Sequence, residues 1–308
     1  MSIYRPEGML IDTIANQQAF KSFSSLQEAY ASGKILESRA IVCDSEHNLI
    51  VDMGIFRGII PREEGALGIA EGTTRDIAII SKVNKSVCYR ITGFHHAPDD
   101  TVIPQLSRRA VQQDCLKNYI MKLTPGDIID AKVTHLESFG CFVDIGCGIP
   151  SLIPIDAISI SRISHPRDRF HAAQEIKAIV KSVGADGRVS LSHKELLGTW
   201  NENAALFRAG ETVAGIVRSV EDYGVFVELT PNLAGLAEPR EGIAAGQHAS
   251  VYIKSLISEK MKAKLIIVDA FDATYRSATS RYFLTEGHID RWQYSPDSSD
   301  RLIETVFN

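Results

Sequence analysis

Residues 139–144 read Phe-Gly-Cys-Phe-Val-Asp, and residues 223–228 read Tyr-Gly-Val-Phe-Val-Glu. The preceding segments match as well, because Gly-Asp-Ile-Ile at 126–129 becomes Gly-Glu-Thr-Val at 210–213. Both pairs are separated by 84 residues, with no gap between them. A fixed internal period is the signature of a repeated structural unit. The chain therefore contains at least two copies of one small domain, and the aromatic-Gly-x-Phe strand is its most distinctive part.

A weaker copy precedes these two. Val-Asp-Met-Gly at 51–54 matches Val-Asp-Ile-Gly at 143–146, and Gly-Ile-Ile-Pro at 58–61 matches Ser-Leu-Ile-Pro at 151–154. Where the later copies carry aromatic-Gly-x-Phe, this copy reads His-Asn-Leu-Ile at 47–50, so its framework is present without the rings. Three units of about 60 to 75 residues, rich in short strands and Gly turns, predict small antiparallel barrels in a row.

This pattern divides the chain into seven segments. They are an N-terminal helix and arm (1–38), a ring-poor first repeat (39–94), a helical linker (95–123), a second repeat (124–195), a linker helix (196–209), a third repeat (210–270) and a C-terminal extension with a hairpin and a helix (271–308).

Capping patterns place two of the helices. Ser25 and Glu28 form a capping-box pattern in a helix over 23–34, and Thr199 and Glu202 form another at the start of the second linker. We therefore expect short helices before the first barrel and between the later two.

Apolar spacing predicts two further elements. Apolar residues four apart predict a linker helix over 104–123, and Ile-Ala-Ile-Ile at 77–80 predicts a strand of the first repeat. In the C-terminal extension, Glu286-Gly287 predicts a hairpin turn, and residues 297–299 are suited to cap a last short helix through 302–306. The aromatic residues of this extension offer either extra stacking surface or, as we favour, packing on the preceding barrel. They are Tyr275, Tyr282, Trp292 and Tyr294.

The repeated rings carry the chemistry. An interior glycine commonly marks a bulge, and we expect it to bring Phe139 and Phe142 to one surface, as well as Tyr223 and Phe226. Exposed flat rings can stack on nucleobases, which makes single-stranded nucleic acid the leading ligand. The rival interpretation buries the second ring of each pair in the core. It is weaker for the first ring, because a tyrosine hydroxyl at the Phe139 position requires water or a hydrogen-bond partner.

Cations follow on the last strand of each repeat. Lys260, Lys262 and Lys264 alternate with apolar residues and so share one face, and Arg188 takes the place of Lys262 in the second repeat. Alternating lysines more often mark a solvated strand face. Their coincidence with rings in two repeats favours contact with phosphate.

On these motifs the chain resembles the RNA-binding repeat named after the bacterial small-subunit ribosomal protein S-one (S1), over residues 39–269. It is similar to a short, three-repeat member of that family. The resemblance implies an all-β dominated fold of tandem five-stranded OB-fold barrels joined by short helices, with a small α+β tail. It further implies RNA contacts by the four rings and by Arg188 or Lys262. Ring-poor first repeats of this family serve protein docking on the ribosome.

Three positions depart from the family pattern. Pro154 and Glu238 stand where the family usually has histidine, and Gly184 stands where it has aspartate. The carboxylate of Glu238 would repel phosphate locally, so the third repeat is expected to bind more weakly or to select a backbone geometry.

Composition limits the alternatives. The 308 residues carry a formal net charge of −5, which argues against blanket phosphate neutralisation but not against stacking. We find no secretory pattern and no apolar run near the roughly 18 to 20 residues that span a bilayer, so we expect a cytoplasmic protein without a membrane partner. The five cysteines form no Cys-x-x-Cys pair, which favours buried thiols over metal chemistry.

The leading hypothesis is non-enzymatic binding of single-stranded RNA (mRNA) in translation through repeats 2 and 3, with the small ribosomal subunit as a further partner. The alternatives are a protein-interaction scaffold and an RNA-binding regulator acting apart from the ribosome. The sequence contains no Gly-x-x-x-x-Gly-Lys-Ser/Thr, His-Glu-x-x-His or Gly-x-Ser-x-Gly motif. We therefore expect no catalytic residue, cofactor, metal or small-molecule substrate.

Overall fold

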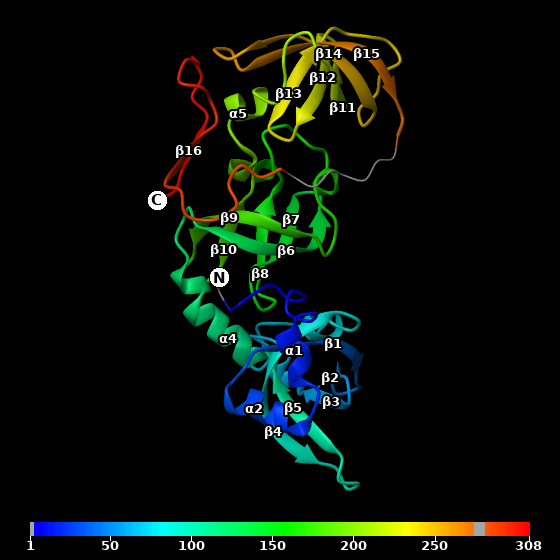
Figure 1. Ribbon diagram of the computed structural model, residues 1–308, viewed down its shortest axis with the longest axis vertical. Coiled ribbons are helices and arrows are strands. Elements are labelled where there is room, and N and C mark those ends of the chain that lie inside the picture. The colour runs from blue at the N-terminus through cyan, green and yellow to red at the C-terminus, as the bar shows by residue number, and fades with distance from the viewer. Residues whose placement is uncertain (1–2, 274–280) are drawn as a thin grey trace. The chain divides into compact units, whose positions relative to one another are not determined.

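The computed structural model describes residues 3–273 and 281–308 and contains three closed five-stranded barrels (Figure 1). Barrel 1 has strand order β1-β2-β3-β5-β4, barrel 2 has β10-β8-β7-β6-β9, and barrel 3 has β11-β12-β13-β15-β14. The all-β dominated fold class of tandem barrels is thereby confirmed.

The strands of barrel 1 are β1 (Leu36–Cys43), β2 (Leu49–Met53), β3 (Phe56–Ile60), β4 (Ser86–His96) and β5 (Val102–Ser107). Those of barrel 2 are β6 (Ile128–Glu137), β7 (Gly140–Asp144), β8 (Pro150–Pro154), β9 (Glu175–Val183) and β10 (Val189–Ser192). Those of barrel 3 are β11 (Thr212–Glu221), β12 (Gly224–Thr230), β13 (Leu233–Ala237), β14 (His248–Ile257) and β15 (Lys262–Phe271).

The chain divides into two compact units. The first comprises residues 1–123, 130–132 and 144–150, and the second comprises 124–129, 133–143 and 151–308. The first unit thus contains barrel 1, and the second contains barrel 3, most of barrel 2 and the C-terminal extension.

Barrel 1 is longer than the repeat expected over 39–94. Strand β5 closes it by pairing with β4, and lies parallel to β3 with Ile59 opposite Gln105. The first part of the expected linker over 95–123 is therefore barrel, and the linker helix α4 (Arg108–Asn118) begins only after Ser107, whose hydroxyl accepts the Ala110 N–H. Residues 104–107 therefore complete the barrel by pairing with β4 and β3, and only the residues after Ser107 follow the predicted helical spacing.

The expected strand at 77–80 is also wrong, because this segment forms the short helix α3 (Ile77–Ile80). Ile79 is fully buried, whereas Ile77 and Ile80 are exposed. A single isoleucine of this helical turn therefore packs into the core, and the segment takes no part in the sheet.

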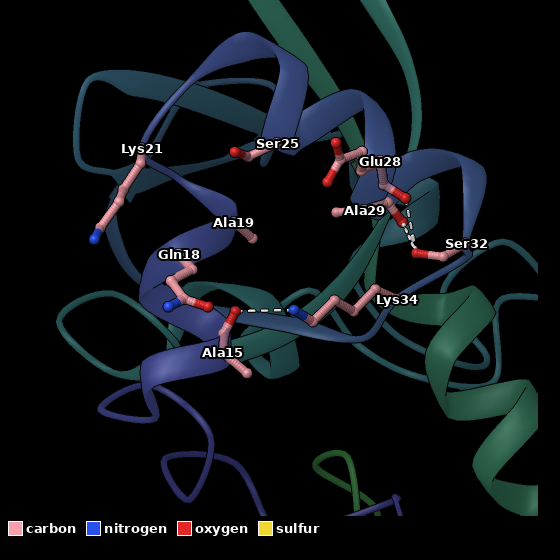
Figure 2. A pocket seen from close by; sticks show the side chains of 9 residues that line it. All are labelled: Ala15, Gln18, Ala19, Lys21, Ser25, Glu28, Ala29, Ser32 and Lys34. Carbon is pink, nitrogen blue, oxygen red and sulfur yellow. Dashed lines mark hydrogen bonds between the residues drawn. The ribbon is translucent and has the colours of Figure 1, made fainter.

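Two helices precede barrel 1, α1 (Ile14–Ala19) and α2 (Phe23–Ala31). Ser22 caps α2 by accepting the Ser25 N–H, so the predicted cap is displaced by one turn from Ser25. Leu26 and Ala29 of α2 join the core of barrel 1. The outer surfaces of the two helices frame a hollow of about 600 Å³, in which the Lys34 ammonium donates to the Ala15 carbonyl (Figure 2).

A buried ion network stabilises the first unit. The Glu7 carboxylate accepts hydrogen bonds from Arg108 Nε at 2.6 Å and from Lys82 Nζ at 2.7 Å, and the Glu7 N–H donates to Asp144 at 2.7 Å. Burial raises the pKa of Glu7, but Arg108 and Lys82 outweigh it and hold this pKa well below its usual range. The N-terminal arm is therefore fixed by charges that lie far apart in the sequence.

In the second unit, the helix α5 (Trp200–Ala204) lies between barrels 2 and 3, and its predicted capping box of Thr199 and Glu202 is confirmed. Trp200 and Ala204 enter a common core with residues of both barrels and of the extension. The other members of this core are Ile179, Leu196, Leu233, Trp292, Tyr294 and Phe307.

The C-terminal extension differs from the prediction. Strand β16 (Arg291–Gln293) pairs with β17 (Glu304–Val306), so the pairing does not turn at Glu286-Gly287, and 304–306 is a strand rather than the end of a helix. Tyr275 lies outside the described residues, and the buried positions of Trp292 and Tyr294 agree with packing rather than stacking.

Candidate nucleic-acid interface

Barrel 3 presents two rings on its outer surface. Along β12, Val225 and Val227 are fully buried, and Phe226 between them points outward and is half-buried. Tyr223, in the turn before the strand, is 67% exposed. The two rings meet edge to face, with centroids 6.1 Å apart and planes at 86°.

Barrel 2 repeats this arrangement. Cys141 and Val143 of β7 are buried, Phe142 points outward and is half-buried, and Phe139 is 54% exposed. The centroids of Phe139 and Phe142 are 5.9 Å apart, and their planes also meet at 86°. The structure thus brings each predicted ring pair together outside the barrel core.

The glycine between the rings acts differently from the predicted bulge. A Cβ atom at Gly140 would lie 2.6 Å from the carbonyl oxygen of Ile153, and one at Gly224 would lie 2.6 Å from that of Ala237. In barrel 3 the register irregularity lies on the facing strand β11, between residues 217 and 219. The glycines therefore permit close approach to the next strand, and the rings share a surface because the first of them stands in the turn.

Sequence reasoning missed a third ring of barrel 2. His135 of β6 stacks on Phe142, with centroids 4.3 Å apart and planes at 9°. The equivalent position in barrel 3 is Ser219, directly opposite Phe226. The repeat comparison gave no sign of this contact, because His135 aligns with a serine and the ring is not repeated. Only a prediction of how β6 pairs with β7 would have revealed it.

The cations of barrel 3 lie beside its rings. Phe226 is opposite Leu236 of β13, and Leu236 is opposite Lys264 of β15, so the three side chains follow one another across the outer surface. Lys262 is exposed at the start of the same strand, whereas Lys260 is exposed in the turn before it, so the expected shared strand face holds for Lys262 and Lys264. This surface therefore combines an apolar row with a positive edge.

Barrel 2 lacks a cation at the equivalent point, because Ser190 of β10 lies opposite Leu152 of β8. Arg188 stands in the preceding turn with a 91% exposed side chain, and it forms an ion pair with Asp186 at 3.2 Å. The guanidinium of Arg188 is therefore exposed to solvent next to the start of β10, with Asp186 beside it.

The acidic residue that ends each motif is buried. Glu228 accepts bonds from Arg218 Nε at 2.8 Å and from Arg169 Nη2 of the barrel 2 loop at 2.5 Å. Burial lowers the pKa of Arg169. Burial, together with the Glu7 charge, raises the pKa of Asp144 to about 6. Both carboxylates fix structure: Asp144 accepts from the N-terminal arm in the first unit, and Glu228 joins barrels 2 and 3 in the second.

Hydrogen bonds reinforce this junction. The Asn232 side-chain amide donates to the carbonyls of Lys194 and Gly198, and the backbone carbonyl of Asn232 accepts from the Tyr294 hydroxyl at 2.6 Å. The ring pairs of barrels 2 and 3 therefore belong to one unit whose parts are held by buried polar contacts.

Within residues 3–273 and 281–308, no group of three or more His, Cys, Asp or Glu residues is arranged to hold a metal ion. No helix of that part is long and apolar enough to cross a membrane. Four of the five cysteines are buried as free thiols.

The family described as S1 RNA binding domain matches residues 122–194. The chain is 30% identical over 264 residues to the small ribosomal subunit protein bS1 of Staphylococcus aureus strain COL, covering 80% of this chain and 64% of that protein. It is 30% identical over 286 residues to the same protein of Staphylococcus haemolyticus, covering 84% and 70%. The chain thus spans somewhat less than two thirds of the S. aureus relative.

Among solved structures, a multidomain protein with nucleic acid binding domains from Streptococcus pneumoniae aligns over 77% of this chain and 74% of its own, with 13% identity and a TM-score of 0.26. That score is too low to equate the two chains as wholes.

Proposed function

Because the chain belongs to the family of the bacterial small ribosomal subunit protein bS1, we propose that it binds single-stranded RNA, as mRNA in translation, through the rings of barrels 2 and 3. The observation that carries this proposal is the pair of outward rings repeated on both barrels, with Phe139 and Tyr223 more than half exposed. Apolar side chains that are exposed together mark interaction sites, whereas single exposed ones are common, so the paired rings on two barrels favour binding.

The geometry favours a single strand over a duplex. Bases can stack on a protein ring only when they are unpaired and splayed out. Each stacked base contributes about 1 to 3 kcal/mol, and the contact tolerates any base, so sequence preference along the ring rows is slight.

The cations serve the backbone of the strand. Lys264 lies across Leu236 from the Phe226 ring, and Lys260, Lys262 and Arg188 extend the positive edge. For a single strand, the logarithm of affinity falls with the logarithm of salt concentration at a slope of about −0.7 for each neutralised phosphate. A few phosphate contacts therefore give a small total slope. Binding then rests on stacking, and its salt dependence is shallow. We assign no chemical step to these residues.

Barrel 1 serves another purpose. At the place of the rings it has the tight turn 44–48, in which the Asp44 carboxylate accepts the N–H groups of Glu46 and Asn48. A ring-free barrel is suited to protein docking, and we assign it that role on the small ribosomal subunit.

The protein-interaction scaffold remains the second candidate, and one observation favours it. Barrel 3 exposes an apolar row away from β12, where Tyr252 lies opposite Ile266, and Val268 and Phe271 are 53% and 40% exposed. Such a row fits a protein surface better than a nucleic acid.

The test is fluorescence anisotropy with a labelled single-stranded oligouridine, a duplex of equal length and a salt titration. We expect the single strand to bind more tightly than the duplex, and equal binding would refute the ring mechanism. Sedimentation of the native protein in cell extract, with and without high salt and nuclease, tests the ribosomal context. Co-migration with small subunits supports it, and partners that survive nuclease away from subunits support the scaffold. Nuclease-sensitive partners away from subunits support a regulator acting apart from the ribosome.

A further inference from the structure

A pocket adjoins the ring row of barrel 3. It has a volume of about 440 Å³, within the range of roughly 300 to 1,000 Å³ occupied by small-ligand sites. Phe226 and Lys260 line it, so two residues of the ring-bearing surface are also walls of the pocket. The opposite wall is residues 299–303 of the C-terminal extension, which has no counterpart in barrel 2.

The wall formed by the extension is held in place. The Tyr294 hydroxyl donates to the backbone carbonyl of buried Asn232, and the backbone N–H of Trp200 donates to the backbone carbonyl of Tyr294 at 3.0 Å. Ile303 is bonded through both backbone groups, to Tyr294 and to the Ser295 hydroxyl. The pocket is therefore preformed and pays little ordering entropy on binding.

The lining suits a flat, polar-edged molecule. The half-buried side chains of Phe226, Met261 and Ile303 supply apolar surface. The exposed side chains of Lys260 and Arg301 supply cations, and those of Glu259 and Asp300 supply carboxylates. Apolar walls accept the faces of a base, the cations accept a phosphate, and the carboxylates accept hydrogen bonds from an exocyclic amino group.

We propose that this pocket takes one nucleotide of the bound strand and prefers a base that carries an amino group, as cytosine does, over uracil, which carries none. The inference rests on the proposed RNA binding and refines it. Stacking on the exposed rings of barrels 2 and 3 does not distinguish the bases. The pocket adds one position at which hydrogen bonds to the edge of the base can distinguish them. Selectivity then comes from a pocket that the extension and barrel 3 form together, with Asp300 from the one and Glu259 from the other.

The experiment compares the full chain with oligocytidine and oligouridine of equal length by fluorescence anisotropy. We expect wild type to bind oligocytidine about fivefold more tightly, the lower end of what a carboxylate contact to the cytosine amino group provides. The double variant Glu259→Gln, Asp300→Asn should bring this ratio close to one while keeping the affinity for oligouridine. Glu63→Gln, which changes an exposed carboxylate of barrel 1, should leave the ratio unchanged.

Arg301→Ala supplies a second readout, because loss of its phosphate contact should weaken both oligonucleotides by a similar factor. Equal binding of the two oligonucleotides by wild type, or a ratio that persists in the double variant, overturns the pocket proposal and leaves RNA binding intact. Failure of wild type to bind either oligonucleotide overturns the proposed function and this inference together.

Discussion

The exposed rings offer the most direct test of how RNA is bound. Phe139→Ala and Tyr223→Ala remove side chains that are 54% and 67% exposed, each in contact with a single neighbouring ring of its own pair, 5.9 or 6.1 Å away. Their loss leaves the barrel cores intact, so changes in affinity report on the ligand.

The size of the effect follows from stacking. One stacked base contributes about 1 to 3 kcal/mol, and we take about 1 to 1.5 kcal/mol because an edge of each ring is already occupied by its neighbour. At about 1.4 kcal/mol for each tenfold change, each variant should weaken binding roughly five- to tenfold. If both barrels engage one strand, the energies add in the Phe139→Ala, Tyr223→Ala double variant, to roughly 30- to 100-fold.

The assay is anisotropy of a labelled oligouridine at fixed salt, with thermal unfolding to verify the fold of each variant. Tyr252→Ala is the matched control, because this exposed tyrosine of barrel 3 lies on β14, which does not pair with β12. Unchanged affinity in the folded double variant would refute the ring mechanism. A double variant no weaker than the worse single variant would show that the two barrels do not share one strand.

Three further predictions concern stability. Glu7→Gln removes the countercharge of buried Arg108 and should lower the free energy of unfolding in urea by about 3 to 5 kcal/mol, and a loss below about 1 kcal/mol would contradict this. Burial lowers the pKa of His193 from 6.5 to about 4, so the fold favours the neutral ring. The stability that the neutral ring contributes is present above pH 6.5 and should be lost as pH falls toward 4, by roughly 3 kcal/mol. The free energy of unfolding in urea should therefore change less with pH in His193→Gln than in wild type. Gly224→Ala places a Cβ atom 2.6 Å from a β13 carbonyl oxygen and should lower the melting temperature, at a cost of about 1 to 3 kcal/mol, whereas an unchanged melting temperature would argue against close approach.

The pH prediction for His193 has a geometric basis. Its Nδ1 lies 2.9 Å from the Ile158 carbonyl and its Nε2 lies 3.1 Å from the Tyr282 hydroxyl. A neutral ring that donates from Nδ1 and accepts at Nε2 satisfies both contacts. Protonation would instead place a positive charge in the core near the Arg169 guanidinium, and burial disfavours that charge.

Local periodicity carried much of the prediction. The 84-residue repeat identified two barrels, and Phe226 does point outward as expected, although simple alternation between buried Val225 and Val227 puts it there and not the expected bulge. These features follow from the pleat of a strand, which alternates side chains between its faces whatever lies beyond it. The capping box at Thr199 is local in the same sense, because its bonds span three residues.

The same local reasoning was wrong at the ends of two predicted helices. The predicted helix over 104–123 begins only at Arg108, because 102–107 forms β5 and pairs with β4, and the end of the extension forms β17 and pairs with β16. In both cases the partner strand decided the conformation, and the apolar spacing of a single segment does not show its partner.

The repeat period is enough to identify the two later barrels, and the weaker third copy predicts barrel 1, because these patterns need no information beyond the motifs of one repeat. The folded chain adds contacts that no period encodes: the stack of His135 on Phe142, the carboxylate of Glu228 shared by Arg169 and Arg218, and the pocket that the extension lines beside Phe226. Arg169 and Glu228, for example, lie 59 positions apart in the chain. The energy of such contacts depends on exclusion from water and on three-dimensional geometry, neither of which a spacing rule describes.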